Sequence, residues 1–304
     1  MLLHENKIRF RELITEASEN LELPPSFIEK DYYVTCLLKR IAGNVPFIVF
    51  KGGTSLSKCF RVIKRFSEDI DLSFGDGKVK ESQSQRQSTN RAVREICRNS
   101  NFGRCTLVNG FHSNGKLNTA VIEYDCLSDD DTVRNEIKIE LSQYLPAYPA
   151  RQMEVGSYIM DYLQREGNQR AIEQFDLSSF PIFVQSLERT FVDKVFALCD
   201  YYLRERFDDN SRHIYDLYCI FPQVRKMEKL RELVGEVREL RMKLGEYAPS
   251  SQSKNSIREL LNLIVTEKCF LRDYNQNTRK YLFEDIPYSK AISVLPEITD
   301  LDIW

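Results

Sequence analysis

The chain has 304 residues, more than one hydrophobic core usually sustains, so one large or two ordinary domains are expected. Its 43 basic and 45 acidic side chains give a net charge of -2, which argues against a protein that coats nucleic acid by overall charge. No apolar run approaches the roughly 20 residues that cross a bilayer, and charges at positions 5 and 7 come too early for a secretory signal, so we expect a cytoplasmic protein without membrane contact.

The first elements are predicted from the spacing of apolar residues. Helical spacing predicts helices over 5–20 and 27–41. Pro24-Pro25 interrupts the chain between them, and Ser26 followed by Glu29 has the pattern of a capping box that starts the second helix. Residues 47–50 are all apolar, which predicts a short buried strand.

A glycine turn follows this strand directly. Its residues are Lys51, Gly52, Gly53, Thr54 and Ser55. Glycines allow backbone N–H groups to approach a phosphate closely, which is how nucleotide-binding turns work. A spacer helix is predicted over 55–64, so the turn links a buried strand to a helix.

Two carboxylates lie one residue apart on the next predicted strand, 66–74. Because side chains alternate along a strand, Asp69 and Asp71 project from one face while Ile70 and Leu72 point into the core. Two such carboxylates repel each other unless a cation lies between them. Mg²⁺ is usually held by one or two carboxylates plus substrate phosphates. Turn and carboxylates together predict a site for a nucleoside triphosphate (NTP).

The middle of the chain is predicted to complete a sheet. Residues 75–90 are almost free of apolar side chains and are expected to form an exposed loop running into a helix at 86–99. Strands are predicted at 104–109, 118–126 and 134–142, the last two joined as a hairpin across the polar turn 128–132. The three consecutive aspartates of that turn are interpreted as a solvated tip, because adjacent side chains on a turn splay apart.

The last of these strands alternates strictly between apolar and charged residues over 136–141. If it pairs beside the strand of Asp69 and Asp71, Glu140 supplies a third carboxylate. The alternative is an ordinary polar face of the sheet.

After residue 180 the pattern becomes almost entirely helical. Helices are predicted at 187–204, 211–220, 224–246, 256–265, 266–282 and 287–299. Lys194 lies beside the apolar stripe of the first, where an ammonium group could meet a triphosphate. Arg212 and Asp216 lie four apart on one helical face and could also form a simple ion pair. We therefore divide the chain into a mixed domain, 1–180, and a helical bundle, 181–304.

A basic set follows the glycine turn at helix-like spacing: Lys58, Arg61, Lys64 and Arg65. These side chains could form a solvated face or could contact an RNA backbone through its phosphates. The sequence does not decide between the two.

Four strings stand out in chain order. They are Phe50-Lys51-Gly52-Gly53-Thr54-Ser55-Leu56, Arg65-Phe66-Ser67-Glu68-Asp69-Ile70-Asp71-Leu72, Thr190-Phe191-Val192-Asp193-Lys194-Val195-Phe196-Ala197-Leu198 and Arg212-His213-Ile214-Tyr215-Asp216-Leu217-Tyr218. Together they closely resemble the AbiEii/AbiGii toxin family of nucleotidyltransferases, the toxin halves of bacterial abortive-infection toxin–antitoxin pairs. The resemblance spans nearly the whole chain. It implies an α+β fold, in which a DNA polymerase β-like mixed sheet flanked by helices precedes a C-terminal helical bundle.

The resemblance also assigns roles to residues. Those it places in catalysis are Asp69, Asp71, Glu140, Lys194 and Asp216. Those it places around the NTP are Lys51, Gly52, Gly53, Thr54, Ser55 and Lys194. The metal ligands it implies are Asp69, Asp71 and, with a looser local match, Glu140. Glu68 faces away from its neighbours on the strand and is not counted as a ligand.

The residues themselves predict metal-dependent nucleotidyl transfer, with an NTP as substrate and two Mg²⁺ ions as cofactors. The resemblance adds a toxin role, an RNA acceptor such as a tRNA 3′ end, and a cognate antitoxin as partner. Two alternatives stay open: transfer to a protein or small-molecule hydroxyl, and a catalytically idle protein that binds an antitoxin.

Overall fold

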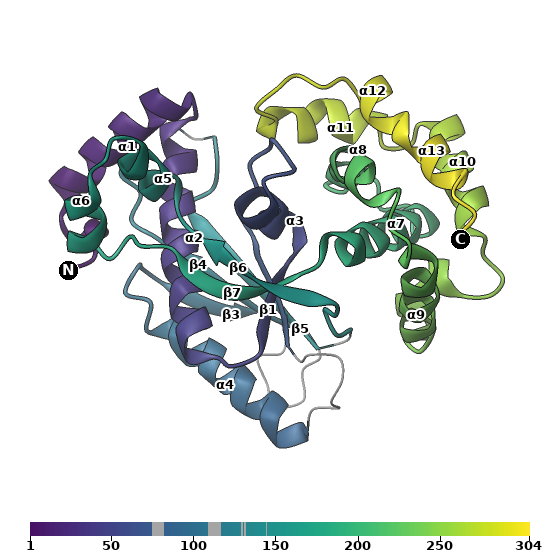
Figure 1. Cartoon of the computed structure of the whole chain (residues 1–304), viewed down its shortest axis with the longest axis horizontal. Coiled ribbons are helices and arrows are strands. Elements are labelled where there is room, and N and C mark those ends of the chain that lie inside the picture. The colour runs from purple at the N-terminus through teal and green to yellow at the C-terminus, as the bar shows by residue number, and fades with distance from the viewer. Residues whose placement is uncertain (75–81, 109–116, 129, 131, 144) are drawn as a thin grey trace. The chain divides into compact units, whose positions relative to one another are not determined.

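The computed structural model describes residues 1–74, 82–108, 117–128, 130, 132–143 and 145–304. They form two compact units, the first made of 1–59 and 68–184, the second of 60–67 and 185–304 (Figure 1). The short segment 60–67 therefore belongs to the second unit, although the chain on either side of it belongs to the first. The division expected at residue 180 placed residues 60–67 in the first domain.

A seven-stranded mixed sheet organises the first unit, in the order β3-β4-β5-β2-β1-β7-β6. β1 pairs antiparallel with β2 and parallel with β7, while β2 pairs parallel with β5. The strands are β1 (Ile48–Lys51), β2 (Ile70–Phe74), β3 (Cys105–Val108), β4 (Leu117–Glu123), β5 (Glu136–Ser142), β6 (Ala150–Val155) and β7 (Phe180–Gln185). This confirms the predicted mixed sheet and the hairpin of β4 with β5.

Helices α2 (Pro25–Asn44) and α4 (Gln83–Arg98) cover one face of this sheet. On that face α2 places Tyr33 against Tyr124, with ring centroids 4.5 Å apart, and Asn118 donates a hydrogen bond to Asn90 of α4. The apolar side chains that alternate along the central strands point the same way and are fully buried: Phe50, Ile70, Leu72, Ile137, Ile139 and Leu141. Each such burial contributes about 1.5–3 kcal/mol, so this side forms the core. The other face of β1, β2 and β5 carries the polar residues.

The start of α2 corrects one prediction. The helix begins at Pro25 after Pro24, so the Ser26–Glu29 capping box is wrong. Ser26 instead donates from its backbone N–H and its hydroxyl to the carboxylate of Asp130, and buried Glu29 accepts the N–H groups of Leu127 and Ser128. Tertiary partners thus take both side chains. Because Asp130 accepts hydrogen bonds from Ser26, the solvated tip predicted for the three aspartates is wrong at this position. Residues 129 and 131 lie outside the described residues.

Residues around the glycine turn also differ from the prediction. Helix α3 (Gly52–Ser55) starts at the turn itself, continues as one π-helical turn, Leu56–Phe60, and ends where Arg61 has φ 53°. Strand β2 begins only at Ile70, so Asp69 lies just before it. The reason is that 60–67 is engaged by the second unit and cannot extend the helix or the strand.

Between β5 and the helical unit the chain forms elements that periodicity did not reveal: β6, helices α5 (Tyr158–Arg165) and α6 (Gln169–Gln174), and β7. The predicted loop 75–90 lies outside the described residues over 75–81, and α4 already begins at Gln83. The N-terminal helix α1 (Lys7–Leu21) packs on α2 and α5.

The second unit is helical, as predicted. Its helices are α7 (Leu187–Leu203), α8 (Arg212–Val224), α9 (Leu230–Met242), α10 (Ile257–Glu267), α11 (Leu271–Gln276), α12 (Tyr288–Ile292) and α13 (Val294–Thr299). Buried α7 packs against α8, α9 and α10. None of the helices described for this chain is long and apolar enough to span a bilayer.

Candidate active site

The polar face of the sheet carries a row of aligned side chains in the first unit. Lys51 of β1 is the register partner of Asp71 in β2, Asp71 is the partner of Glu140 in β5, and Glu140 is the partner of Thr119 in β4. Because register partners project from the same face, these four side chains are neighbours. The pairing of the Glu140 strand with the Asp71 strand, the condition under which Glu140 would join the aspartates, is present. A cation and two carboxylates therefore lie side by side at the end of β1.

Gly52, at the start of α3, lies against one of these carboxylates. Its φ is +78°, in the left-handed region, and a Cβ built on it would lie 2.0 Å from Oδ2 of Asp71. No L side chain fits there without displacing that carboxylate. The glycine turn is therefore shaped around Asp71.

The hydroxyl groups of the turn hold its backbone. Buried Thr54 donates from Oγ1 to the carbonyl of Asp69 at 2.6 Å, and buried Ser55 donates from Oγ to the carbonyl of Gly52 at 2.9 Å. The first bond ties α3 to the residue that enters β2. Contact of these residues with a phosphate remains a prediction.

Substitution of Gly52 by Ala is expected to abolish activity and to lower the free energy of unfolding by about 1–2 kcal/mol, because Ala is strained at positive φ and meets Asp71. Gly43 in α2 is the matched control, since nothing lies within 4 Å of a Cβ built there. Gly43→Ala should keep activity and stability. Urea unfolding and a nucleotidyl-transfer assay check both variants; equal behaviour of the two would contradict the expectation.

Lys138 joins the carboxylates on this face. It lies two residues before Glu140 on β5 and forms an ion pair with it. Partial burial lowers the pKa of Lys138, but the Glu140 carboxylate, with further attraction from Asp69 and Asp71, offsets this and leaves the pKa raised. Both aspartates therefore act on the same ammonium group. Sequence reasoning missed Lys138, although the alternation over 136–141 already placed it on the face of Glu140.

The carboxylates on this face are a candidate donor set for Mg²⁺. Among the residues that the structure describes, no group of three or more His, Cys, Asp or Glu side chains could hold a metal ion by itself. Asp69 and Asp71 offer two carboxylates, the number Mg²⁺ commonly takes from a protein when substrate phosphates supply further oxygens. The residues present fit such an ion. Glu140 lies beside Asp71 but is engaged by Lys138, so its role as a third ligand stays a prediction.

Replacing Lys138 by Met is expected to tighten the binding of a divalent ion at least about fivefold, because a competing positive charge leaves the carboxylates. Lys138→Arg keeps the charge and serves as the control. Mn²⁺ titration followed by electron paramagnetic resonance measures the affinity without any turnover. Equal Mn²⁺ affinity of wild type and Lys138→Met would contradict the expectation.

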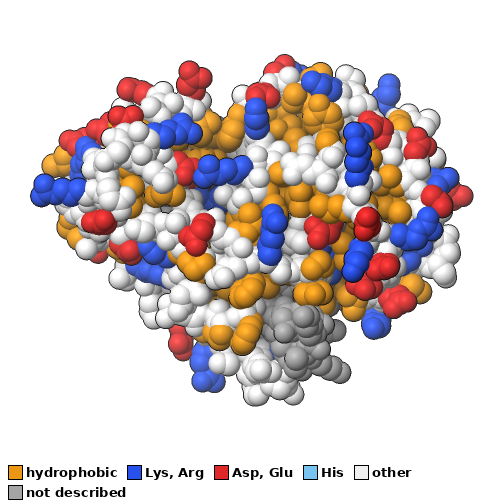
Figure 2. All heavy atoms as spheres, in the orientation of Figure 1, with side chains coloured by type: hydrophobic (Ala, Val, Ile, Leu, Met, Phe, Trp, Pro, Cys, Tyr) orange, Lys and Arg blue, Asp and Glu red, His pale blue; other side chains and the backbone are white. Residues whose placement is uncertain are grey.

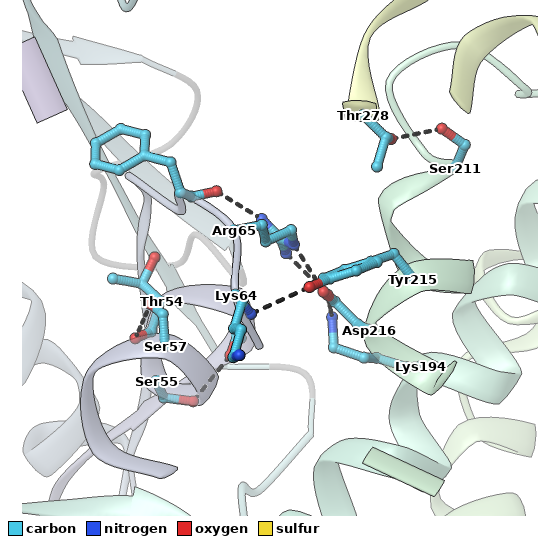
Figure 3. A network of polar contacts seen from close by, with 12 residues as sticks. Thr54, Ser55, Ser57, Lys64, Arg65, Lys194, Ser211, Tyr215, Asp216 and Thr278 are labelled. Atoms are coloured by element: carbon cyan, nitrogen blue, oxygen red, sulfur yellow. Dashed lines mark hydrogen bonds and ion pairs between the residues drawn. The ribbon is translucent and has the colours of Figure 1, made fainter. Parts of the chain in front are cut away.

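The second unit contains a separate buried cluster, drawn in Figure 3. Lys194 on α7 donates from Nζ to Oδ2 of Asp216 on α8 at 2.7 Å. Arg65, from the segment 60–67, donates from Nε and Nη2 to the two oxygens of the same carboxylate, at 2.7 and 2.8 Å. Asp216 is fully buried, and Arg65 and Lys194 are 4% and 7% exposed. The Arg212–Asp216 pair considered from the sequence is thus replaced by pairs with Arg65 and Lys194.

Charge in this cluster follows from burial and pairing. Burial raises the pKa of Asp216, but Arg65 and Lys194 overcome this and hold the pKa well below its usual range. Burial lowers the pKa of Lys194, and attraction to Asp216 offsets this only in part, because Arg65 repels the ammonium group. Burial also lowers the pKa of neighbouring His213 well below its ordinary value. One ionised carboxylate therefore serves two cations.

Three residues of the basic set after the glycine turn form ion pairs within the protein. Lys58 pairs with buried Asp31, Lys64 pairs with Glu284, and Arg65 pairs with Asp216. Lys58, whose side chain is 4% exposed, and buried Arg65 fit neither alternative drawn from the sequence, a solvated face or contact with phosphates. The pairing of Arg65 with Asp216 was not predicted; the signal in the sequence was the place of Arg65 in the string that leads to Asp69.

Glu68, expected to face away from the aspartates, pairs with a lysine. Lys30 is buried in α2, forms an ion pair with Glu68 and donates to the carbonyl of Arg134 at 2.9 Å. The charged residue beside Asp69 therefore anchors this part of the chain to α2.

The family model described as nucleotidyl transferase AbiEii toxin, type IV toxin–antitoxin system, matches residues 36–293. The chain is also similar to the solved structure of MenT4, a nucleotidyltransferase toxin from Mycobacterium tuberculosis H37Rv: the TM-score is 0.51, the identity is 16%, and the match covers 96% of this chain and 90% of that one. At this identity the likeness shows the fold alone. No curated protein matches the chain.

Proposed function

Since the chain belongs to the AbiEii family, nucleotidyltransferase toxins of type IV toxin–antitoxin systems, we propose that it transfers a nucleotide from an NTP to an RNA acceptor such as a tRNA 3′ end. An NTP substrate, a divalent metal and a cognate antitoxin go with this family. The more specific parts of the proposal are the RNA acceptor, Mg²⁺ as the ion and two ions per site. A cytoplasmic location accompanies it, because NTPs and tRNA are found there.

The row of Lys51, Asp71 and Glu140 beside Gly52 is the observation that supports the proposal most. Divalent ions in such sites activate the attacking hydroxyl and neutralise the departing pyrophosphate. Asp69 and Asp71 would hold the metal, and Gly52 leaves room for the carboxylate that does so. Lys51, on the same face, would attract the triphosphate. Glu140 would orient the acceptor hydroxyl and take its proton.

Lys194 would supply positive charge to the triphosphate, as phosphoryl transfer needs cations that stabilise the developing charge. It lies on α7, and the bond from its Nζ to Oδ2 of Asp216 holds its ammonium group in place. Asp216 would act through Lys194, because it bonds to Nζ.

We expect local groups of basic side chains, and not the overall charge of the protein, to bind the RNA acceptor. In Figure 2, Lys and Arg side chains are interspersed with Asp and Glu over the face in view, in keeping with the net charge of -2. RNA affinity that rests on a small number of phosphate contacts should depend weakly on salt.

Transfer is tested by incubating the purified protein with Mg²⁺, each labelled NTP in turn, and total tRNA. Label should join RNA with wild type and not with Asp71→Ala. Mass spectrometry of the product identifies the acceptor: label on a protein or small molecule would replace RNA with the alternative acceptor classes. If wild type labels nothing that Asp71→Ala does not, the proposal fails.

The toxin role has its own test, growth of a bacterium that expresses the protein. Wild type should arrest growth, Asp71→Ala should not, and co-expression of the antitoxin should restore growth. Equal growth with wild type and Asp71→Ala would contradict this role.

A further inference from the structure

Backbone hydrogen bonds join the segment 60–67 to the rest of the second unit. Phe66 donates its N–H to the carbonyl of Tyr281 at 2.8 Å, and Phe283 donates to the carbonyl of Lys64 at 2.9 Å, around the antiparallel bridge of Arg65 with Leu282. In the chain, this segment follows the glycine turn and precedes Asp69 directly. Whatever holds the segment therefore holds the connection between the two motifs of the sheet.

Arg65 makes buried side-chain contacts from this segment. Its guanidinium meets Asp216 with two parallel bonds, and its Nη1 donates to the carbonyl of Phe66 at 3.0 Å. A forked pair of this kind fixes the plane of the carboxylate, which a lysine cannot do. Oδ2, which accepts from Arg65, also accepts from Lys194 (Figure 3). The position of the Lys194 ammonium is thus set by a carboxylate that Arg65 orients.

The cluster carries more positive than negative charge. Arg65 and Lys194 contribute two cations, and Asp216 contributes one anion. An unbalanced buried charge is costly and is relieved by a counter-ion. Arg65 takes part of the attraction of Asp216, so Lys194 keeps an affinity for another anion. Without Arg65, the carboxylate and Lys194 would neutralise each other.

We propose that Arg65 is a positioning residue for the transfer reaction: it orients Asp216 and leaves the Lys194 ammonium available to the triphosphate. This inference rests on the proposed function, in which Lys194 meets the NTP. Arg65 itself touches neither substrate nor metal in this scheme. It acts through Lys194.

The test compares Arg65→Lys, which keeps the charge and loses the fork, with wild type, Lys194→Met and the double variant. Arg65→Lys should raise the KM for NTP about tenfold with little change in kcat, and should have less than a twofold effect when Lys194 is already Met. Lys64→Met, on the same segment but exposed, is the control and should match wild type. An Arg65→Lys variant with unchanged KM, or one whose effect is undiminished beside Lys194→Met, would overturn the inference.

A binding measurement separates this inference from the proposed function. Inorganic tripolyphosphate is titrated calorimetrically into folded wild type, Arg65→Lys and Lys194→Met, with folding checked by thermal unfolding. Wild type should bind it, and both variants should lose about tenfold or more in affinity. If wild type transfers no nucleotide but this pattern holds, the proposed function fails and the role of Arg65 stands. If wild type binds no tripolyphosphate, or Arg65→Lys binds as wild type does, the inference is wrong.

Discussion

Replacement of Asp71 by Asn is expected to lower the rate of nucleotidyl transfer by about a thousandfold or more, equivalent to about 4 kcal/mol in the transition state. Asp71 lies at the centre of the row, with Lys51 on one side and Glu140 on the other. Its carboxylate is the group that Gly52 makes room for. The amide of Asn keeps the shape of this side chain but loses the charge that would hold a divalent ion. Initial rates with saturating NTP measure the effect.

Stability distinguishes loss of chemistry from loss of fold in this variant. Asp71→Asn should unfold at the wild-type temperature or slightly above it, because removing one of several neighbouring carboxylates relieves repulsion. Asp125→Asn is the control, since Asp125 is an exposed carboxylate in the same unit with a long ion pair to Lys7 of 3.9 Å. It should keep full activity. An active Asp71→Asn enzyme would exclude Asp71 as a metal ligand.

Replacement of Asp216 by Ala is expected to lower the free energy of unfolding of the second unit by about 3–5 kcal/mol, because Arg65 and Lys194 are left buried without an anion. This variant should also lose activity through Lys194. Asp208→Ala, at an exposed position of the same unit, should be near wild type. Guanidinium unfolding gives the difference, and a loss below about 1 kcal/mol would contradict the ion-pair network.

The ion pairs of Asp216 should also make stability depend on pH in acid. The pKa of Asp216 is held below its usual value in the folded protein, so its contribution to stability is present above the ordinary carboxyl pKa of about 4 and is lost as the pH falls further. Wild type should therefore lose stability more steeply than Asp216→Asn between pH 5 and pH 2. Unfolding midpoints measured across that range check the slope.

The residues that the family resemblance assigns to catalysis and to the NTP are divided between the two compact units. Gly52, Asp71 and Glu140 belong to the first, Lys194 and Asp216 to the second, and Arg65 lies on the segment that passes between them in the chain. Along the sequence, these residues therefore come from the first unit, then the second, then the first again, and finally the second.

Local patterns in the sequence were sufficient for several features of this protein. The alternation that places Glu140 on one face of its strand depends only on the two-residue period of a strand. The parallel pairing of Asp71 with Glu140 agrees with that pattern, because any other register face would bury charge and expose Ile139 and Leu141. The family and the mixed sheet could be recognised because their signals are short strings of neighbouring residues.

Tertiary structure alone decided which charges meet. Arg65 and Asp216 are 151 positions apart, and Ser26 and Asp130 are 104 apart, so no local period links them. From the sequence, Arg65 was interpreted as part of a basic set and Ser26 as a helix cap. In the structure both residues bond to distant carboxylates instead. An ion pair or a hydrogen bond depends on a few ångströms of proximity after folding, whereas a strand or helix pattern depends on the covalent repeat of the chain. The sequence therefore determined the faces of the sheet and the identity of the motifs, and the fold determined how Lys194, Asp216 and Arg65 share one carboxylate.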